Sequence, residues 1–175
     1  MQVATLSANK TSGLGKLIAD QPDGEQFFTT RAGVGLESID LAEAARWLVH
    51  VHAYDPSGIK SGAHGDPRVK GGKGYPIGIG WAGWCGILLP QGRTLKDTLL
   101  LSLALNLDAL AGASRDEDRP VWERPPSTAA PERGHEEPAG PADLLTWQSR
   151  RVRLVRSGDR VTDALISNGD PIHPR

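Results

Sequence analysis

The chain has 175 residues and a formal net charge of −1 at pH 7, which allows one domain with a hydrophobic core but excludes a wholly basic nucleic-acid coat protein. Its single cysteine, Cys85, cannot form an internal disulfide and fits a reducing compartment, so we expect a cytoplasmic protein. No apolar run approaches the roughly 18 residues that are needed to span a bilayer.

The first part of the chain predicts an irregular start followed by a helix. Turn-forming residues at 7–13 indicate a loop, and residues 27–29 indicate a short strand. A helix is expected to follow Asp40, because Asp40 and Glu43 have the spacing of a capping box. The sequence Asp55-Pro56 ends this helix. Its apolar stripe is formed by Leu41, Ala44, Ala45, Leu48, Val49 and His52.

Residues 57–92 contain eleven of the 21 glycines of the chain. This density predicts a shaped loop rather than a regular element, because glycine reaches positive φ and lets another backbone come close. We expect the helices on both sides to pack together and hold its ends, while its middle stays free to meet a ligand. The stretch also carries four cations and three aromatic residues, which are Lys60, Arg68, Lys70, Lys73, Tyr75, Trp81 and Trp84.

A second helix is predicted from a cap at Thr94 to Gly112, with Asp97 in its first turn. Leucines surround nearly its whole axis, so we expect this helix to be buried. Prolines and acidic residues at 114–142 then indicate a solvated linker or long loop. Within that loop, Trp122 is expected to be pinned to the core.

The end of the chain predicts a β-hairpin. Residues 145–155 and 161–166 have strand character, and Ser157-Gly158-Asp159 separates them as a turn. Asn168-Gly169 indicates a further turn.

Two glycine motifs resemble nucleotide-binding loops but lack the surrounding context. Residues 78–83 fit G-x-G-x-x-G, yet Tyr75-Pro76 precedes them instead of a strand, and Gly86 forbids a long helix after them. Gly71-Gly72-Lys73 resembles the end of a P-loop, but Gly74 stands where the magnesium-binding Ser or Thr is needed. A phosphate-binding enzyme is therefore only a weak alternative.

Metal and catalytic sites are disfavoured for similar reasons. His50 and His52 are two residues apart on a predicted helix, so their side chains point about 200° apart and cannot chelate one ion together. Cys85 has no base beside it, and the chain has no Gly-x-Ser-x-Gly motif. We expect no catalytic residue, no metal and no cofactor.

The basic, glycine-rich segment at 60–74 is the remaining candidate for a binding site. Its simplest interpretation is a solvated surface loop. The functional interpretation is a nucleic-acid contact, because each lysine or arginine near a phosphate releases a condensed counterion. Glycine backbone can also lie against a minor groove that a side chain would block, and the minor groove is read only degenerately.

Several blocks of the sequence resemble the CasA family, the large subunits of the type I-E CRISPR interference complex Cascade. These blocks are residues 54–103, then RPVWERP at 119–125 and LLTWQSRRVRLV at 144–155, together with the opening residues 1–22. The resemblance covers essentially the whole chain in the order of the family.

The resemblance implies a non-catalytic subunit that takes part in antiviral defence. In the family this subunit checks the protospacer-adjacent motif (PAM) on double-stranded DNA, while base pairing with the guide RNA reads the rest of the target. The implied partners are the other Cascade subunits, the guide RNA, the target DNA and a helicase-nuclease that the full-length subunit recruits.

The resemblance also implies which residues touch nucleic acid. The family's glycine loop, which enters the minor groove at the PAM, corresponds to Gly71, Gly72, Lys73 and Gly74. We add the neighbouring cations Lys60, Arg68 and Lys70 as candidate contacts. An earlier family loop, which touches the 5′ end of the guide RNA, falls at residues 9–16, where the candidates are Asn9, Lys10 and Lys16.

Family members are several times longer than this chain and carry further PAM contacts, a lysine finger and a glutamine wedge, as well as a C-terminal four-helix bundle. The chain therefore resembles an internal piece of the N-terminal domain. We expect an α+β, loop-rich mixed fold with two main helices, a long glycine-rich loop and a C-terminal β-hairpin. A truncated, inactive fragment of the same subunit is the alternative function.

Overall fold

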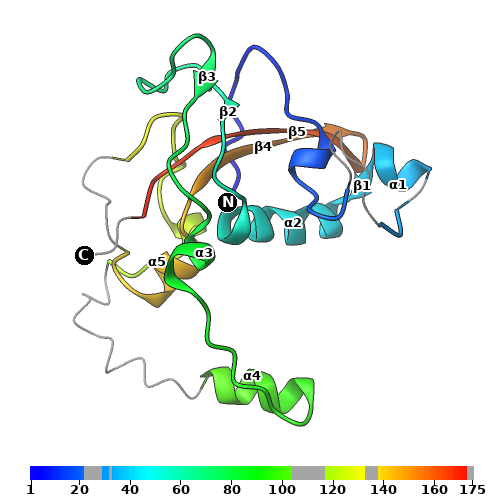
Figure 1. Ribbon diagram of the computed structural model, residues 1–175, viewed down its shortest axis with the longest axis vertical. Coiled ribbons are helices and arrows are strands. Elements are labelled where there is room, and N and C mark those ends of the chain that lie inside the picture. Colours follow the sequence, from blue (N-terminus) through cyan, green and yellow to red (C-terminus); the bar gives the residue numbers. More distant parts are fainter. Residues whose placement is uncertain (22–28, 32, 104–116, 133–137, 173–175) are drawn as a thin grey trace.

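The computed structural model describes residues 1–21, 29–31, 33–103, 117–132 and 138–172, and its fold is mixed α+β (Figure 1). A three-stranded antiparallel sheet has the order β1 (Ile39–Asp40), β5 (Arg160–Asn168), β4 (Arg150–Ser157), and β2 (Lys60–Ser61) pairs separately with β3 (Lys73–Gly74). The helices are α1 (Val34–Glu37), α2 (Leu41–Tyr54), α3 (Trp81–Cys85), α4 (Leu95–Leu103) and α5 (Pro141–Leu145), with 3-10 turns η1 (Leu14–Lys16) and η3 (Val121–Glu123). Among the described residues, no helix has the length and apolar character of a membrane span.

The predicted C-terminal hairpin is confirmed. Strands β4 and β5 pair antiparallel along their length, with one irregularity between Val155 and Arg156. Gly158 in the connecting turn has a φ of 63°, the left-handed conformation that a tight hairpin turn requires. The predicted first strand begins too early, because Leu145 is the last residue of α5.

The predicted turn at Asn168-Gly169 is wrong. The Gly169 N–H donates to the carbonyl of Ser149 at 3.1 Å, and the Asp170 N–H donates to that of Gln148 at 3.0 Å. The two chains therefore stay paired beyond β5. Glycine is needed because of this close approach, since a Cβ at position 169 would lie 2.2 Å from the Gln148 carbonyl oxygen.

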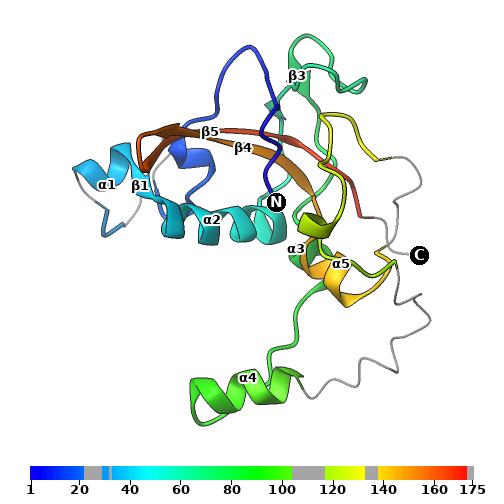
Figure 2. The same ribbon diagram turned by 180° about the vertical axis from the view of Figure 1, so that it is seen from behind.

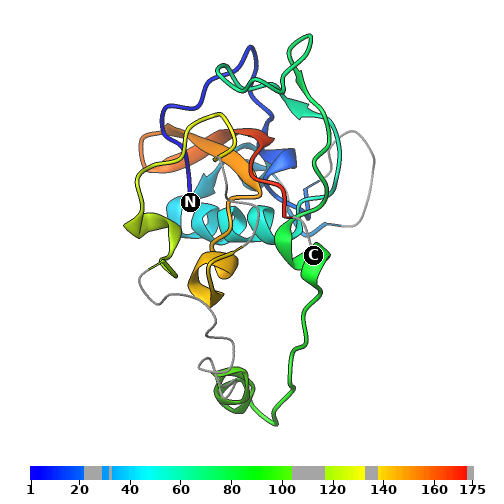
Figure 3. The same ribbon diagram turned by 90° about the vertical axis from the view of Figure 1, so that its left-hand side faces the viewer.

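Helix α2 covers one face of the sheet (Figure 3). Its cap forms as predicted, because Asp40 Oδ1 accepts from the Glu43 N–H at 2.7 Å. The predicted apolar stripe is only partly buried, since Leu41 and Val49 are 42% and 48% exposed. The residues of α2 that are buried are Ala44, Leu48, Val51, His52 and Ala53.

Residues 3–8 of the N-terminal segment and the β2–β3 pair lie on the other side of the sheet from α2 (Figures 1 and 2). Leu14, Leu17 and Ile18 of the same segment pack instead in the cluster that contains the buried residues of α2. The segment is tied to the hairpin, since the Val3 N–H donates to Val152 O and the Ser12 N–H to Ala164 O, both at 2.7 Å. Leu165 of β5 packs on this side in a cluster with Val3, Leu6 and Ala63. The hairpin therefore supports the segments on which the candidate site lies.

Helix α4 is exposed, contrary to the prediction that it is buried. Its leucines Leu95 and Leu103 are 74% and 75% exposed, and the helix projects away from α2 and the sheet (Figures 1 and 3). Its predicted cap is present, because Thr94 Oγ1 accepts from the Asp97 N–H at 3.1 Å. The predicted end at Gly112 and residues 27–28 of the predicted short strand lie outside the described residues.

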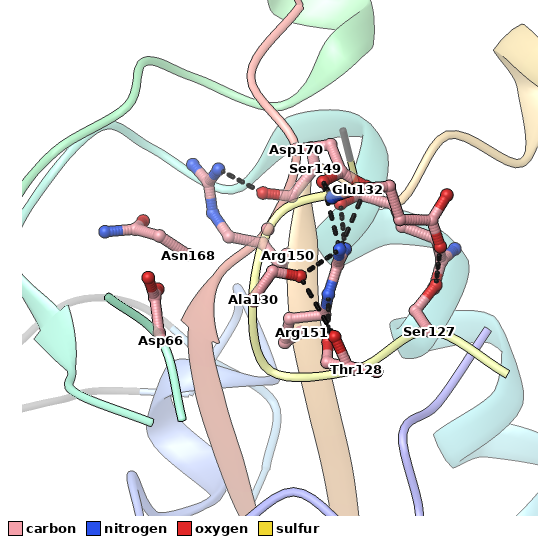
Figure 4. Close-up of polar contacts among 12 residues, drawn as sticks. Asp66, Ser127, Thr128, Ala130, Glu132, Ser149, Arg150, Arg151, Asn168 and Asp170 are labelled. Carbon is pink, nitrogen blue, oxygen red and sulfur yellow. Dashed lines mark hydrogen bonds and ion pairs between the residues drawn. The ribbon is translucent and has the colours of Figure 1, made fainter. Parts of the chain in front are cut away.

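The described part of the predicted linker, residues 117–132, contacts the end of the hairpin. Arg151 donates to the carbonyls of Thr128 at 2.7 Å and Ala130 at 3.1 Å, and its guanidinium pairs with Asp170 (Figure 4). Trp122 is 64% exposed, so the prediction that it anchors this segment is wrong. The buried arginine performs that role instead.

Helix α3 begins within the G-x-G-x-x-G motif at 78–83 and therefore tests whether that motif belongs to a dinucleotide-binding unit. It has only five residues and is preceded by coil, so the strand and long helix of a dinucleotide-binding unit are not formed here. The residue before this helix, Gly80, has no room for a side chain. A Cβ there would lie 2.4 Å from the Ala53 carbonyl group at the end of α2.

Candidate nucleic-acid interface

A tight turn closed by Lys70 and Lys73 forms the tip of the glycine-rich segment. These two residues exchange both backbone N–H···O bonds at 3.1 Å, and the central Gly71 and Gly72 have φ values of 57° and 73°. Positive φ at both central positions is what a type I′ turn requires, which explains the pair of glycines. All four residues are exposed. The tip therefore presents glycine backbone flanked by two lysines; we call residues 70–73 the glycine turn.

The base of the glycine turn is fixed by the sheet. Strands β2 and β3 pair below it, and the Gly62 N–H donates to Gly72 O at 3.0 Å. Gly74 is buried, and the Asn168 side-chain amide at the end of β5 donates to Tyr75 O at 2.5 Å. The prediction that two packed helices hold this segment is wrong, because α4 lies away from α2 (Figure 1). Strand β5 and the N-terminal segment hold it instead.

Arg68 has an internal role that the sequence did not indicate. Its guanidinium lies 2.9 Å from Asp66 Oδ2 and donates to the carbonyls of Asn168 at 3.2 Å and Gly169 at 2.9 Å. The side chain is 30% exposed. Arg68 therefore links the glycine-rich segment to the end of β5, and most of its donors are already in use.

Lys60 is also held by the protein. Its ammonium lies 2.7 Å from the Asp55 carboxylate and 3.2 Å from the Pro56 carbonyl oxygen, and its side chain is only 11% exposed. Burial lowers the pKa of Lys60; the nearby Asp55 opposes this shift, and the positive charges of Arg150 and Lys16 add to it. Lys60 is thus a fixed cation with another lysine nearby.

The structure brings the two predicted contact segments together. Ala8 and Ala63 form an antiparallel β-bridge, and His64 Nε2 lies 3.0 Å from Asn9 Oδ1. A Cβ added at Gly72 would lie 3.5 Å from the Asn9 amide nitrogen. Residues 9–16 and the glycine turn, which are far apart in the sequence, therefore form one continuous surface.

A cavity of about 310 Å³ opens between these two segments. Ile59 and Ile166 provide apolar parts of its lining. No aspartate or glutamate lines it in the part of the chain that the structure describes. Four lysines also line it, namely Lys10, Lys16, Lys60 and Lys73, and we call it the lysine cavity.

Two fully buried arginines that support this surface were missed from the sequence. Arg150 and Arg151 are 0% exposed. Arg150 donates to Asp55 at 2.5 Å and to the Gly78 carbonyl at 2.8 Å, so it fixes the acid that in turn holds Lys60. In the sequence, Arg151 and Arg153 alternate with Val152 and Leu154, a pattern that predicts a polar face for the arginines. Alternation cannot show that a distant carboxylate, here Asp170, makes such burial possible (Figure 4).

Known proteins share this fold over nearly the whole chain. The family model of the CRISPR-associated protein Cse1 matches residues 1–175. Cse1 from Thermobifida fusca is 52% identical with a TM-score of 0.83, and the match covers 99% of this chain and 32% of that one. Cse1 from Acidimicrobium ferrooxidans is 36% identical with a TM-score of 0.70, covering 98% and 32% of the two chains.

A more distant match comes from a larger assembly. A chain of a CRISPR RNA-guided surveillance complex, in a pre-nicking state, is 28% identical with a TM-score of 0.63, covering 96% of this chain and 32% of that one. No curated protein matches the sequence. The chain spans about a third of the length of the solved structures that it matches.

Proposed function

Because this chain belongs to the CRISPR-associated protein Cse1 family, we propose that it is a non-catalytic, nucleic-acid-binding part of a Cascade surveillance complex that acts in antiviral defence. The match to a chain of an RNA-guided surveillance complex supports assembly with other Cascade subunits and a guide RNA. The helicase-nuclease is a partner of the full-length subunit in this proposal.

The glycine turn is the contact with target DNA in this proposal. Its two glycines are exposed and lack side chains, so the backbone can approach the floor of a minor groove about 6 Å wide. Lys70 and Lys73 flank them and can each neutralise a phosphate at the edge of the groove. Such a contact tests a short motif such as the PAM with degenerate readout, while base pairing reads the rest.

Residues 9–16 are the contact with the 5′ end of the guide RNA. Asn9 and Lys10 are exposed beside the glycine turn, and Lys16 is exposed at the end of η1. The position of this segment is fixed, since the Gly13 N–H donates to Asp163 Oδ1 of β5 at 2.8 Å. One subunit surface can therefore be adjacent to both nucleic acids.

The observation that carries the proposal is the exposed glycine turn with positive φ at both glycines. Its test is the affinity of the assembled, guide-loaded complex for a PAM-bearing duplex. Lys73→Ala should weaken binding and lower the slope of log K against log salt concentration by about 1. Gly72→Asp should weaken it more, because it adds a side chain and a negative charge at the groove.

Lys96→Ala on the exposed helix α4 is the matched control and should leave the affinity unchanged. Unchanged affinity in the two turn variants, with the complex intact, would contradict the DNA contact. Failure of the unaltered chain to co-purify with the other Cascade subunits would favour the inactive alternative.

A further inference from the structure

The lysine cavity concentrates positive charge more than its surroundings do. Lys10 and Lys16 come from the N-terminal segment, Lys60 from β2 and Lys73 from β3, so cations from both contact segments meet in one place. The chain as a whole has a net charge of −1, so this concentration is a local feature. A cavity of this composition favours an anion.

The acid that pairs with Lys60 does not cancel this charge. Asp55 Oδ2 lies 2.7 Å from Lys60 and 2.5 Å from the buried Arg150, so one carboxylate serves two cations. The charge of Lys16 also disfavours the protonated form of Lys60, which indicates repulsion between these lysines. An anion placed between them would relieve that repulsion.

The size and lining of the cavity restrict the kind of anion. Its volume of about 310 Å³ is far larger than the roughly 10–15 Å³ that a cavity needs to hold one water. Ile59, which is exposed, adds apolar surface, which suits the carbon atoms of a sugar better than a bare, fully hydrated ion. A phosphate carried by a nucleotide sugar matches both properties.

We propose that the lysine cavity binds one phosphate group of a nucleic-acid strand, which Lys10 and Lys73 contact from opposite segments while Lys60 stays fixed between them. The inference rests on the proposed function for the origin of the strand. Guide RNA and target DNA offer the same phosphate chemistry, and the experiment separates them. What the inference adds is that the two contact segments share a single ligand group.

The test compares Lys10→Ala, Lys73→Ala and the double variant in the assembled complex. One titration measures binding of a PAM-bearing duplex to the guide-loaded complex, and a second measures binding of the subunit to the rest of the complex carrying guide RNA. A phosphate from duplex DNA should lower the salt slope by about 0.9, and one from single-stranded RNA by about 0.7.

A shared phosphate predicts that the double variant lowers the slope by no more than either single variant. Lys70→Ala is the matched control, because Lys70 is on the glycine turn but does not line the cavity; its effect should add to that of Lys10→Ala. A double variant whose loss is the sum of the two single losses would overturn the proposal. An unchanged slope for Lys10→Ala in both titrations would also overturn it.

These outcomes are distinct from a failure of the DNA contact. If Lys70→Ala and Gly72→Asp weaken duplex binding while Lys10→Ala changes neither titration, the cavity proposal falls and the DNA contact stands. If Lys10→Ala and Lys73→Ala share one loss while Gly72→Asp binds normally, the cavity proposal stands without the minor-groove contact. Lys10 and Lys73 are exposed, so their replacement should leave the thermal unfolding of the subunit unchanged.

Discussion

The ammonium of Lys60 lies 2.7 Å from the carboxylate of Asp55, at the point where helix α2 ends and the glycine-rich segment begins. The same carboxylate oxygen accepts from the buried Arg150 of β4. A single acid thus connects the core of the hairpin to a cation in the lysine cavity. Folding stability and the geometry of the candidate interface should therefore depend on the same residue.

Asp55→Asn should destabilise the subunit strongly. It leaves the buried guanidinium of Arg150 without a counter-charge, and breaking a buried pair in this way costs about 3–5 kcal/mol. The free energy of unfolding from denaturant titration measures the loss. Asp159→Asn, at an exposed position in the hairpin turn, is the control and should change it by less than about 0.5 kcal/mol. Equal effects of the two variants would show that the pair is not important.

His52 should make the subunit sensitive to acid. Its Nε2 lies 3.0 Å from the Met1 carbonyl oxygen, and its Nδ1 lies 3.4 Å from the backbone N–H of Arg150. One ring nitrogen thus faces an acceptor and the other faces a donor, which fits neutral imidazole. Burial, together with nearby positive charges, lowers the pKa of His52 from 6.5 to about 4. Between pH 6.5 and pH 4, His52 therefore binds a proton in the unfolded state but not in the native state. Stability contributed by His52 is therefore present above pH 6.5 and is lost as the pH falls to 4.

This loss amounts to about 3 kcal/mol, from 1.36 kcal/mol for each pKa unit. His52→Gln cannot titrate, so its free energy of unfolding should change less between pH 6.5 and 4 than that of the unaltered protein. His50→Gln is the control, because His50 is only partly buried and its ring contacts those of Trp47 and Tyr54. A His52→Gln variant with the full acid sensitivity would exclude this residue as its source.

Gly71 should tolerate asparagine but not valine. A Cβ at this position would meet no atom within 4 Å, so the cost of a side chain comes from its φ of 57° and not from a clash. A β-branched residue in this conformation costs at least about 1–2 kcal/mol, whereas asparagine is accepted in type I′ turns. Hydrogen exchange of the Lys73 amide, which donates to Lys70, measures the turn directly. Exchange should accelerate in Gly71→Val and stay slow in Gly71→Asn; equal rates would contradict the turn assignment.

Local signals in the sequence predicted much of the fold. The cap at Asp40, the end of α2 before Pro56 and the C-terminal hairpin each follow from short-range spacing, and all three are present. The paired glycines at 71–72 likewise predicted a shaped segment, since their conformation depends mainly on the absence of a side chain. These features need no information about distant residues.

The errors concern tertiary contacts. The leucines of α4 predicted a buried helix, but Leu103 is 75% exposed. The sequence of a helix does not show which other element covers its apolar side chains. The predictions for Trp122 and Arg151 are both wrong. The aromatic residue, which was expected to be buried, is exposed, and the charged residue, which was expected on a polar face, is buried. The cost of burying Arg151 is offset by Asp170 and by carbonyls of residues 128 and 130, which a reading of local patterns does not connect. The meeting of residues 9–16 with the glycine turn also depends on such contacts.

The central claim, that the glycine turn lies against target DNA, is tested most directly by site-specific crosslinking in the assembled complex. A photo-reactive phenylalanine analogue replaces Lys70, which is exposed beside the turn glycines, and a second variant carries it at Lys96 on α4. We predict a crosslink from position 70 to the target duplex at the PAM, and none from position 96. Crosslinks from position 70 to neighbouring protein alone, with the duplex bound, would contradict it.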